Sequence, residues 1–181
     1  MQSEQLKPEE FDLHITNGTC RIAFVGMSNA GKSYRSKVLK NECGFLWYQV
    51  DEKISRALQL ASVDNMASWL GYPSSSGYAE REEKYLELEN IFTKEAAMQT
   101  NGKNLVFDTT GSVTQLRRDT LDTLKENCLI VHLDVGEDTL AKLIEKFFRD
   151  PKPVAWGEFF SMRPGETEET IEKTIDYAIH L

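Results

Sequence analysis

Residues 26–33 read GMSNAGKS and match GxxxxGK[ST], the pattern of a phosphate-binding loop. Glycines allow the turns that aim successive backbone N–H groups at phosphate oxygens, and the start of the following helix reinforces this field. Lys32 would act catalytically by neutralising charge on the β- and γ-phosphates, while the Ser33 hydroxyl would ligate Mg²⁺. The motif predicts an ATP site; the alternative is a glycine-rich turn with an incidental lysine. The expected nucleotide contacts are Gly26, Asn29, Ala30, Gly31, Lys32, Ser33 and Tyr34.

Two carboxylates stand at the ends of apolar runs that read as strands. Asp51 follows residues 45–50, and Asp108 ends residues 104–108. In a parallel sheet these carboxyl ends meet at the crevice where ligands bind. We expect Asp51 to orient or deprotonate the acceptor hydroxyl, and Asp108 to contact Mg²⁺ or orient its ligands. Position and electrostatics matter more here than base strength, because phosphoryl transfer has a loose transition state. The alternative for either carboxylate is a helix N-cap.

The turn after Asp108 is the first candidate for the acceptor site. Residues 109–112 read TTGS and are rich in hydroxyls and backbone donors. These groups could hold a polar substrate, so we expect contacts from Thr110 and Gly111. The alternative is an ordinary polar turn between a strand and a helix.

Residues 149–165 have the composition of a lid. They place Arg149, Lys152 and Arg163 on a stretch interrupted by proline and glycine. A lid excludes water and brings cations to the transferring phosphoryl group, which predicts catalytic and nucleotide contacts from Arg149 and a substrate contact from Arg163. The alternative is a surface loop with solvated charges.

Short apolar runs that alternate with helical patterns must position these side chains. The expected strands are residues 21–25, 45–50, 104–108 and 128–134. Helices are expected over residues 31–41, after Asp51, and over 79–97, 113–126, 137–148 and 166–179. Such alternation is typical of an α/β fold. With the loop motif it predicts a three-layer α/β/α P-loop NTPase sandwich, with a mostly parallel sheet of four to five strands and a mobile lid.

Composition excludes several classes of protein. The 181 residues suit one domain, and 21 Lys and Arg against 29 Asp and Glu leave a net charge of −8, which argues against a nucleic-acid partner. No apolar run is long enough to span a membrane, and the start of the chain lacks the layout of a signal peptide. The three cysteines are widely spaced, which suits a reducing compartment. We expect a cytoplasmic protein, or one in an organelle of a eukaryote, that acts on a small molecule; the oligomeric state stays open.

Taken together, these features resemble the shikimate kinase family over residues 21–163. The matching segments are residues 26–33, 51–54, 78–82, 108–112 and 133–134. The resemblance implies a kinase that binds ATP and Mg²⁺ at the loop and contacts the acceptor hydroxyl through Asp51. It also implies that the lid arginine corresponds to Arg149 and that the adenine contact falls at Lys142.

The departures from that family concern the acceptor site. Its paired Asp-x-Asp reads Gln49-Val50-Asp51 here, so one acidic group near Mg²⁺ is missing. The arginine that grips the shikimate carboxylate falls at Ala79, and the nearby Arg81 becomes the candidate substrate contact. The triple glycine reads Thr110-Gly111-Ser112. Without the bidentate clamp a site should hold shikimate poorly.

These observations favour a phosphotransferase that uses ATP and Mg²⁺ on a hydroxyl of a small metabolite, with an altered acceptor site. One alternative is a gluconate or nucleotide kinase on the same fold. Another is a catalytically inactive, shikimate-kinase-like module that only binds nucleotide, which the two missing charged residues favour.

The chain is expected to form a single kinase-like domain, with residues 1–20 as an N-terminal extension. Its last helical pattern ends where the family has a final strand still to come. We therefore expect either a truncated chain or a sheet edge filled by another segment, for which residues 11–15 are the candidate.

Overall fold

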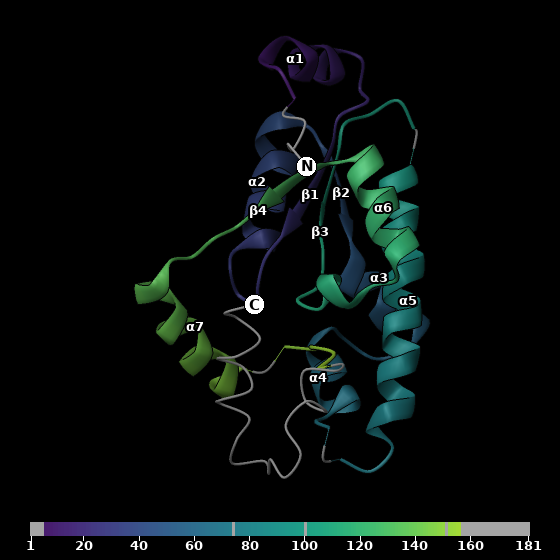
Figure 1. The fold of residues 1–181 in the computed structure, drawn as a ribbon, viewed down its shortest axis with the longest axis vertical. Helices are drawn as coiled ribbons and strands as arrows, with labels where there is room; N and C mark the ends of the chain where they lie inside the picture. The colour runs from purple at the N-terminus through teal and green to yellow at the C-terminus, as the bar shows by residue number, and fades with distance from the viewer. Residues whose placement is uncertain (1–5, 74, 100, 151, 157–181) are drawn as a thin grey trace.

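The computed structural model describes residues 6–73, 75–99, 101–150 and 152–156. Figure 1 shows a central sheet with helices on both of its faces. The strands are β1 (Arg21–Val25), β2 (Leu46–Gln49), β3 (Leu105–Asp108) and β4 (Leu129–His132). The helices are α1 (Pro8–Thr16), α2 (Lys32–Cys43), α3 (Val50–Ala57), α4 (Asp64–Leu70), α5 (Tyr78–Met98), the short 3₁₀ helix η1 (Val113–Gln115), α6 (Arg118–Asn127) and α7 (Glu137–Arg149).

All four strands of the described sheet are parallel, in the order β2-β3-β1-β4. This confirms the predicted α/β class and the parallel sheet. Phe24 of β1 and Gln49 of β2 both lie opposite Asp108 of β3, so the three strands end at the same level. The loop after β1, the first turn of α3 and the turn after β3 are therefore brought to one edge of the sheet.

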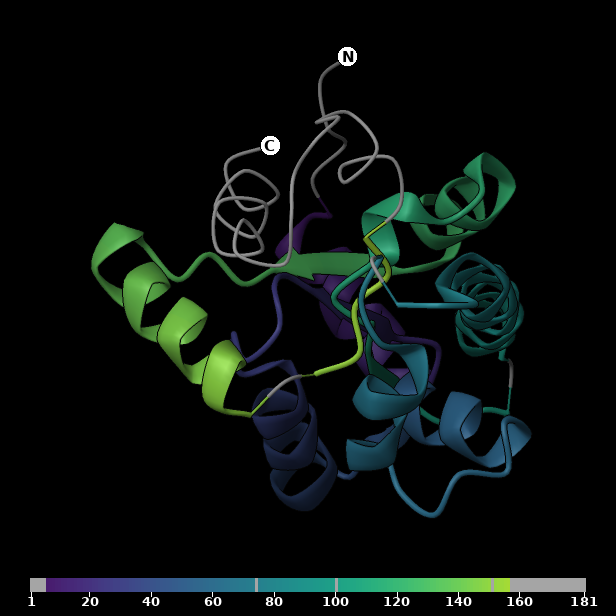
Figure 2. The same cartoon turned by 90° about the horizontal axis from the view of Figure 1, so that it is seen from below.

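Alternate side chains of the strands enter two apolar cores. Ala23 and Phe107 face a large cluster with residues of α3, α5 and α6, whereas Ile22, Phe24 and Val106 face a smaller cluster under α1 and α2. Because both faces are covered, the strands carry near-continuous apolar runs, as the sequence suggested. Figures 1 and 2 show α2 on one side of the sheet and α5 with α6 on the other. No helix in the described part of the chain is long and apolar enough to cross a membrane.

Some local predictions were wrong. Residues 11–15 do not pair with the sheet but lie in α1, where Pro8 opens the helix and the Glu10 carboxylate accepts the Lys7 backbone N–H at 3.0 Å. Phe11 and Ile15 use helical spacing to pack on the smaller cluster. The helix expected over residues 113–126 is interrupted between η1 and α6. The helix expected over residues 166–179 lies outside the described residues.

Candidate functional site

The phosphate-binding loop leaves the buried strand β1 and turns back at glycines. Gly26 has a φ of 142°, and a Cβ there would lie 3.0 Å from the Leu133 carbonyl oxygen. Gly31 has a φ of 92° and precedes the first residue of α2. Both values favour glycine, because L side chains rarely adopt them. The motif thus sits between a strand and a helix, the context that its chemistry requires.

Lys32 is buried at the centre of the site, with 8% of its surface exposed. Its ammonium donates to the carbonyl oxygens of Gly26 at 2.7 Å and Met27 at 2.9 Å, so the side chain lies against its own loop. Burial lowers the pKa of Lys32, while the carboxylates of Asp51, Asp108 and Glu89 raise it. These carboxylates come from three different elements, which makes Lys32 the common cation of the site.

Asp108 links the loop to the sheet through both of its carboxylate oxygens. Ser33 Oγ donates to Oδ2 at 2.5 Å, and Trp47 Nε1 donates to Oδ1 at 2.6 Å. Asp108 also lies opposite Gln49 in the register of β2 and β3. An acidic residue therefore lies opposite position 49, on the neighbouring strand.

No group of three or more His, Cys, Asp and Glu side chains among the described residues is arranged to hold a metal ion. The oxygens of Ser33 and Asp108 are nevertheless the hard ligands that Mg²⁺ prefers. Mg²⁺ commonly takes only one or two protein ligands and completes its coordination with water and substrate phosphates. A two-oxygen site of this kind fits that pattern.

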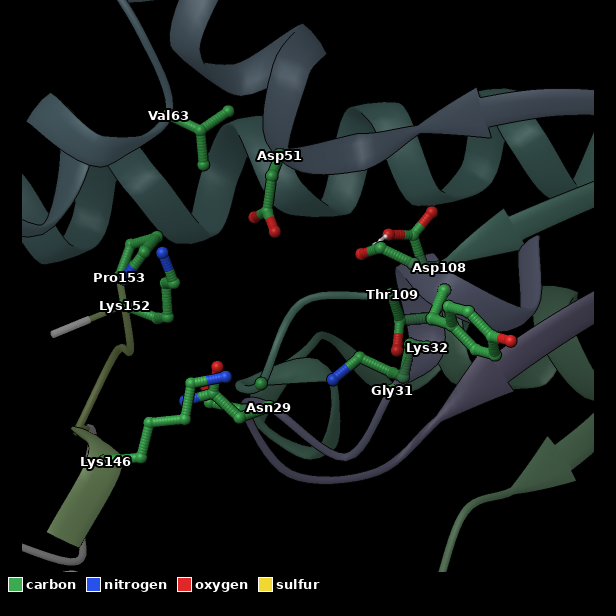
Figure 3. A pocket seen from close by; sticks show the side chains of 14 residues that line it. Asn29, Gly31, Lys32, Asp51, Val63, Asp108, Thr109, Lys146, Lys152 and Pro153 are labelled. Atoms are coloured by element: carbon green, nitrogen blue, oxygen red, sulfur yellow. Dashed lines mark hydrogen bonds between the residues drawn. The ribbon is translucent and has the colours of Figure 1, made fainter. Parts of the chain in front are cut away.

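Asp51 is the second residue of α3, whose N-cap is Gln49, so Asp51 does not occupy the capping position. Its Oδ1 is sealed from solvent and has no hydrogen-bond partner in the described structure. Burial raises the pKa of Asp51 to about 6; Asp108 adds to the rise, and Lys32 and Lys152 oppose it. In Figure 3 the carboxylate points into the cavity. The carboxylate, rather than its buried Oδ1 alone, is therefore placed to meet a polar group of a ligand.

A cavity of about 350 Å³ joins the loop to Asp51. Figure 3 shows Asp108 on one side, Asp51 above, and Lys146, Lys152 and Pro153 on the side away from Asp108. Of the expected nucleotide residues, Asn29, Gly31, Lys32, Ser33 and Tyr34 line this cavity. Gly26 and Ala30 belong to the loop but do not line it.

Lys152 brings the segment after α7 to the cavity. It lies 3.3 Å from Asp64 at the start of α4 and 3.2 Å from Asp150, and it also interacts electrostatically with Asp51. Arg149 instead forms an exposed pair with Glu145 at 3.2 Å and does not line the cavity. Lys142 is exposed on α7 and does not line it either, and Arg163 lies outside the described residues.

Arg81, expected to contact the substrate, holds the turn between α4 and α5. Its guanidinium donates to the carbonyl oxygens of Leu70 at 3.0 Å and Ser76 at 2.9 Å, and it does not line the cavity. Gly111 does line the cavity, and a Cβ there would lie 2.7 Å from Ser28 Oγ. Thr110 is buried and does not line the cavity. The structure therefore brings Gly111 to the expected acceptor site but neither Arg81 nor Thr110.

Glu89 is the residue that the sequence analysis missed. It is fully buried on α5, where Thr110 Oγ1 donates to one carboxylate oxygen and Ser112 Oγ to the other, the latter at 3.0 Å. Burial raises its pKa to about 8, against the lowering effect of the two hydroxyls. Its position four residues after the buried Tyr85, on the inner face of the helix, was the signal that could have found it.

The structure can be compared with known proteins. No protein-family model matches the sequence. No curated protein matches it either. Shikimate kinase from Acinetobacter baumannii, solved in complex with shikimate, matches with a TM-score of 0.64 and 18% identity over 94% of this chain and 78% of that one. Shikimate kinase from Bacteroides thetaiotaomicron matches with a TM-score of 0.59 and 19% identity over 89% of this chain and 78% of that one. The chain therefore has a shikimate-kinase-like P-loop fold, which confirms the resemblance at the level of fold.

The raised pKa of Glu89 makes stability depend on pH. The folded value of about 8 lies above the ordinary 4.5, so the folded state binds the proton more tightly. The resulting stabilisation is complete below pH 4.5 and is lost as the pH rises through 8, with a slope of up to about 1.4 kcal/mol per pH unit. Glu89→Gln should remove this slope from the free energy of unfolding, measured with urea between pH 5 and 8.

Glu87→Gln is the matched control, because Glu87 is exposed on the same helix. Its curve should run parallel to that of the wild type. Parallel curves for Glu89→Gln and wild type would show that Glu89 titrates normally.

Proposed function

We propose that this protein is a phosphotransferase that moves the γ-phosphoryl group of ATP, with Mg²⁺, to a hydroxyl of a small polar metabolite. The observation that carries the proposal is that one cavity is lined both by the phosphate-binding loop and by Asp51, whose carboxylate has an oxygen without a partner. The loop alone would suffice to bind a nucleotide, whereas a carboxylate on the same cavity could also meet an acceptor hydroxyl. Both are expected where a donor phosphate must meet an acceptor hydroxyl.

The loop side of the cavity suits the donor. Lys32 now donates to two loop carbonyls, and its ammonium can exchange those partners for phosphate oxygens. Ser33 and Asp108 would hold Mg²⁺, and the bound ion would neutralise charge on the phosphate oxygens. Asn29, Gly31 and Tyr34 would line the phosphate path. Gly26 and Ala30 shape the loop itself.

Asp51 suits the acceptor. A substrate hydroxyl in the cavity could donate to the Asp51 carboxylate, which lines it and has an oxygen without a partner, and this bond would orient the nucleophile. In the reaction the hydroxyl proton passes to Asp51, the substrate oxygen bonds to the γ-phosphorus, and the bond to the ADP oxygen breaks. A carboxylate with a pKa of about 6 is ionised at neutral pH and still accepts a proton readily.

The acceptor is proposed to differ from shikimate, the compound bound in one structural relative. Ala79, at the position of the family's clamp arginine, is exposed on α5, and Arg81 is engaged with backbone carbonyls. No arginine lines the cavity in the described part of the chain. These lining residues suit a hydroxylated molecule whose binding does not depend on an arginine that grips a carboxylate through two hydrogen bonds. Gly111 and, from outside the described residues, Arg163 remain proposed contacts.

The loop lysine provides the first test. Lys32→Ala should lower the affinity for ATP at least tenfold and reduce turnover by about 100-fold or more, because it removes the buried cation beside the phosphates. Calorimetry with ATP and Mg²⁺, followed by ADP release with a panel of hydroxylated metabolites, measures both effects. Lys37→Ala, at an exposed position of the same helix, is the control.

A wild-type protein that binds no ATP would refute the proposal. Binding of ATP without turnover on any acceptor would instead favour the alternative that the protein is a catalytically inactive module that only binds nucleotide.

Asp51 gives a test by pH. With a folded pKa of about 6, the ionised base is lost below that value, so kcat/KM should fall about tenfold per pH unit below pH 6. Asp51→Asn should lower kcat by about 100-fold or more and abolish this limb of the profile. Glu52→Gln, the neighbour that pairs with Arg56, should keep it. An unchanged limb in Asp51→Asn would assign the titration to another group.

A comparison of Lys152 with Arg149 tests which of the two is the cation that stabilises the transferring phosphoryl group. Lys152 lines the cavity, whereas Arg149, the sequence-based candidate, pairs with Glu145. If Lys152 stabilises the transferring phosphoryl group, Lys152→Met should reduce kcat by about 100-fold while Arg149→Met changes it less than threefold. Steady-state kinetics at saturating ATP measures this. The reverse order would restore Arg149 to the role.

A further inference from the structure

Trp47 contacts the site without lining its cavity. Its indole N–H donates to Asp108 Oδ1 at 2.6 Å, and Ser33 Oγ donates to Oδ2 of the same carboxylate at 2.5 Å. Each oxygen of Asp108 therefore accepts from a different donor, one from the sheet and one from the loop. The three side chains form a line from β2 through β3 to the first turn of α2.

The sheet and the helix above it hold the indole ring in place. Trp47 lies two residues before Gln49, which is opposite Asp108, so Trp47 and Asp108 are diagonal neighbours on one face. The ring packs against the smaller core cluster, and Lys40 Nζ of α2 lies 5.8 Å from its centroid. A donor on a ring packed in this way has a defined direction.

The chemistry of the indole decides what this contact can do. An indole N–H donates only and cannot ligate a cation. Its bond to Oδ1 opposes rotation of the carboxylate and leaves Oδ2 facing Ser33. A hydroxyl that donates its proton to Oδ2 keeps its lone pairs available for a cation. Outer hydrogen bonds that orient metal ligands in this way typically change metal affinity 10- to 100-fold.

We propose that Trp47 is a positioning residue, which acts through Asp108 to orient the Ser33 hydroxyl toward the Mg²⁺ of a bound nucleotide. This inference rests on the proposed function, because it needs a nucleotide with its metal at the loop. The competing explanation is that Trp47 only packs against the smaller cluster. In that case the loss of its N–H would change stability but not the contribution of Mg²⁺ to binding.

The test removes the N–H and keeps a ring. Calorimetry with a non-hydrolysable ATP analogue, with and without Mg²⁺, gives the gain in affinity that the metal provides. Trp47→Phe should reduce that gain about tenfold and leave the metal-free affinity within twofold. Trp69→Phe is the matched control, since Trp69 packs on α4 against the larger cluster, and it should leave both affinities unchanged.

A double-mutant cycle separates action through Asp108 from packing. In the Asp108→Asn background, Trp47→Phe should cause no further loss of the metal-dependent gain. Equal gains in Trp47→Phe and wild type, or additive losses in the double variant, would overturn the inference while leaving the proposed function intact. A wild-type protein that binds no analogue would overturn both.

A measurement on protein that keeps Trp47 covers the case in which Trp47→Phe does not fold. In ¹⁵N-labelled wild type, the Trp47 indole resonance should shift when the analogue and Mg²⁺ bind, and the Trp69 resonance should not. Asp108→Asn should move the Trp47 resonance before any ligand is added, because the acceptor is no longer charged. A Trp47 resonance that responds to neither change would overturn the inference.

Discussion

A single buried cation organises this site. Lys32 is only 8% exposed and donates to carbonyl oxygens of its own loop, and carboxylates from α3, β3 and α5 interact with it electrostatically. Buried carboxylates are costly, and three of them exceed the charge of one lysine. Protonation relieves part of this excess, since burial raises the pKa of both Asp51 and Glu89. The negative charge that remains around Lys32 favours the binding of a further cation there, which agrees with the Mg²⁺ that we propose beside Ser33 and Asp108. In this protein the phosphate-binding loop and the acid cluster are one electrostatic unit.

The parallel sheet explains how groups so distant in sequence reach that unit. β1, β2 and β3 end at the same level, so the loop, the start of α3 and the turn after β3 share one edge. Register also shows what lies beside Gln49. Asp108 of β3 lies directly opposite Gln49, so an acidic residue is present on the strand next to the position where the family's first aspartate is missing.

The two sides of the cavity differ in how they are held. On the proposed ATP side, Asp108 accepts hydrogen bonds from Trp47 and Ser33. On the proposed acceptor side, Glu89 of α5 accepts from Thr110 and Ser112 of the turn after β3, while one oxygen of Asp51 has no partner. Lys152 reaches this side from the segment after α7 and is shared between Asp64 and Asp150. Asp108 thus has both carboxylate oxygens paired, whereas Asp51 keeps one oxygen unpaired, and this difference agrees with the proposal that a substrate hydroxyl meets Asp51.

The sequence by itself determined the loop, the strands and the α/β class, because these depend on short-range patterns: glycine conformations, apolar runs and helical spacing. It also singled out Asp51 and Asp108, because residues at the carboxyl ends of parallel strands lie at one edge of the sheet. Only the tertiary structure decided that Glu89 joins them, that Lys152 rather than Arg149 lines the cavity, and that Trp47 bonds Asp108. Those relations depend on strand register and on the docking of α5 and α7. Register and docking are set by the packing of whole elements, which no local pattern specifies.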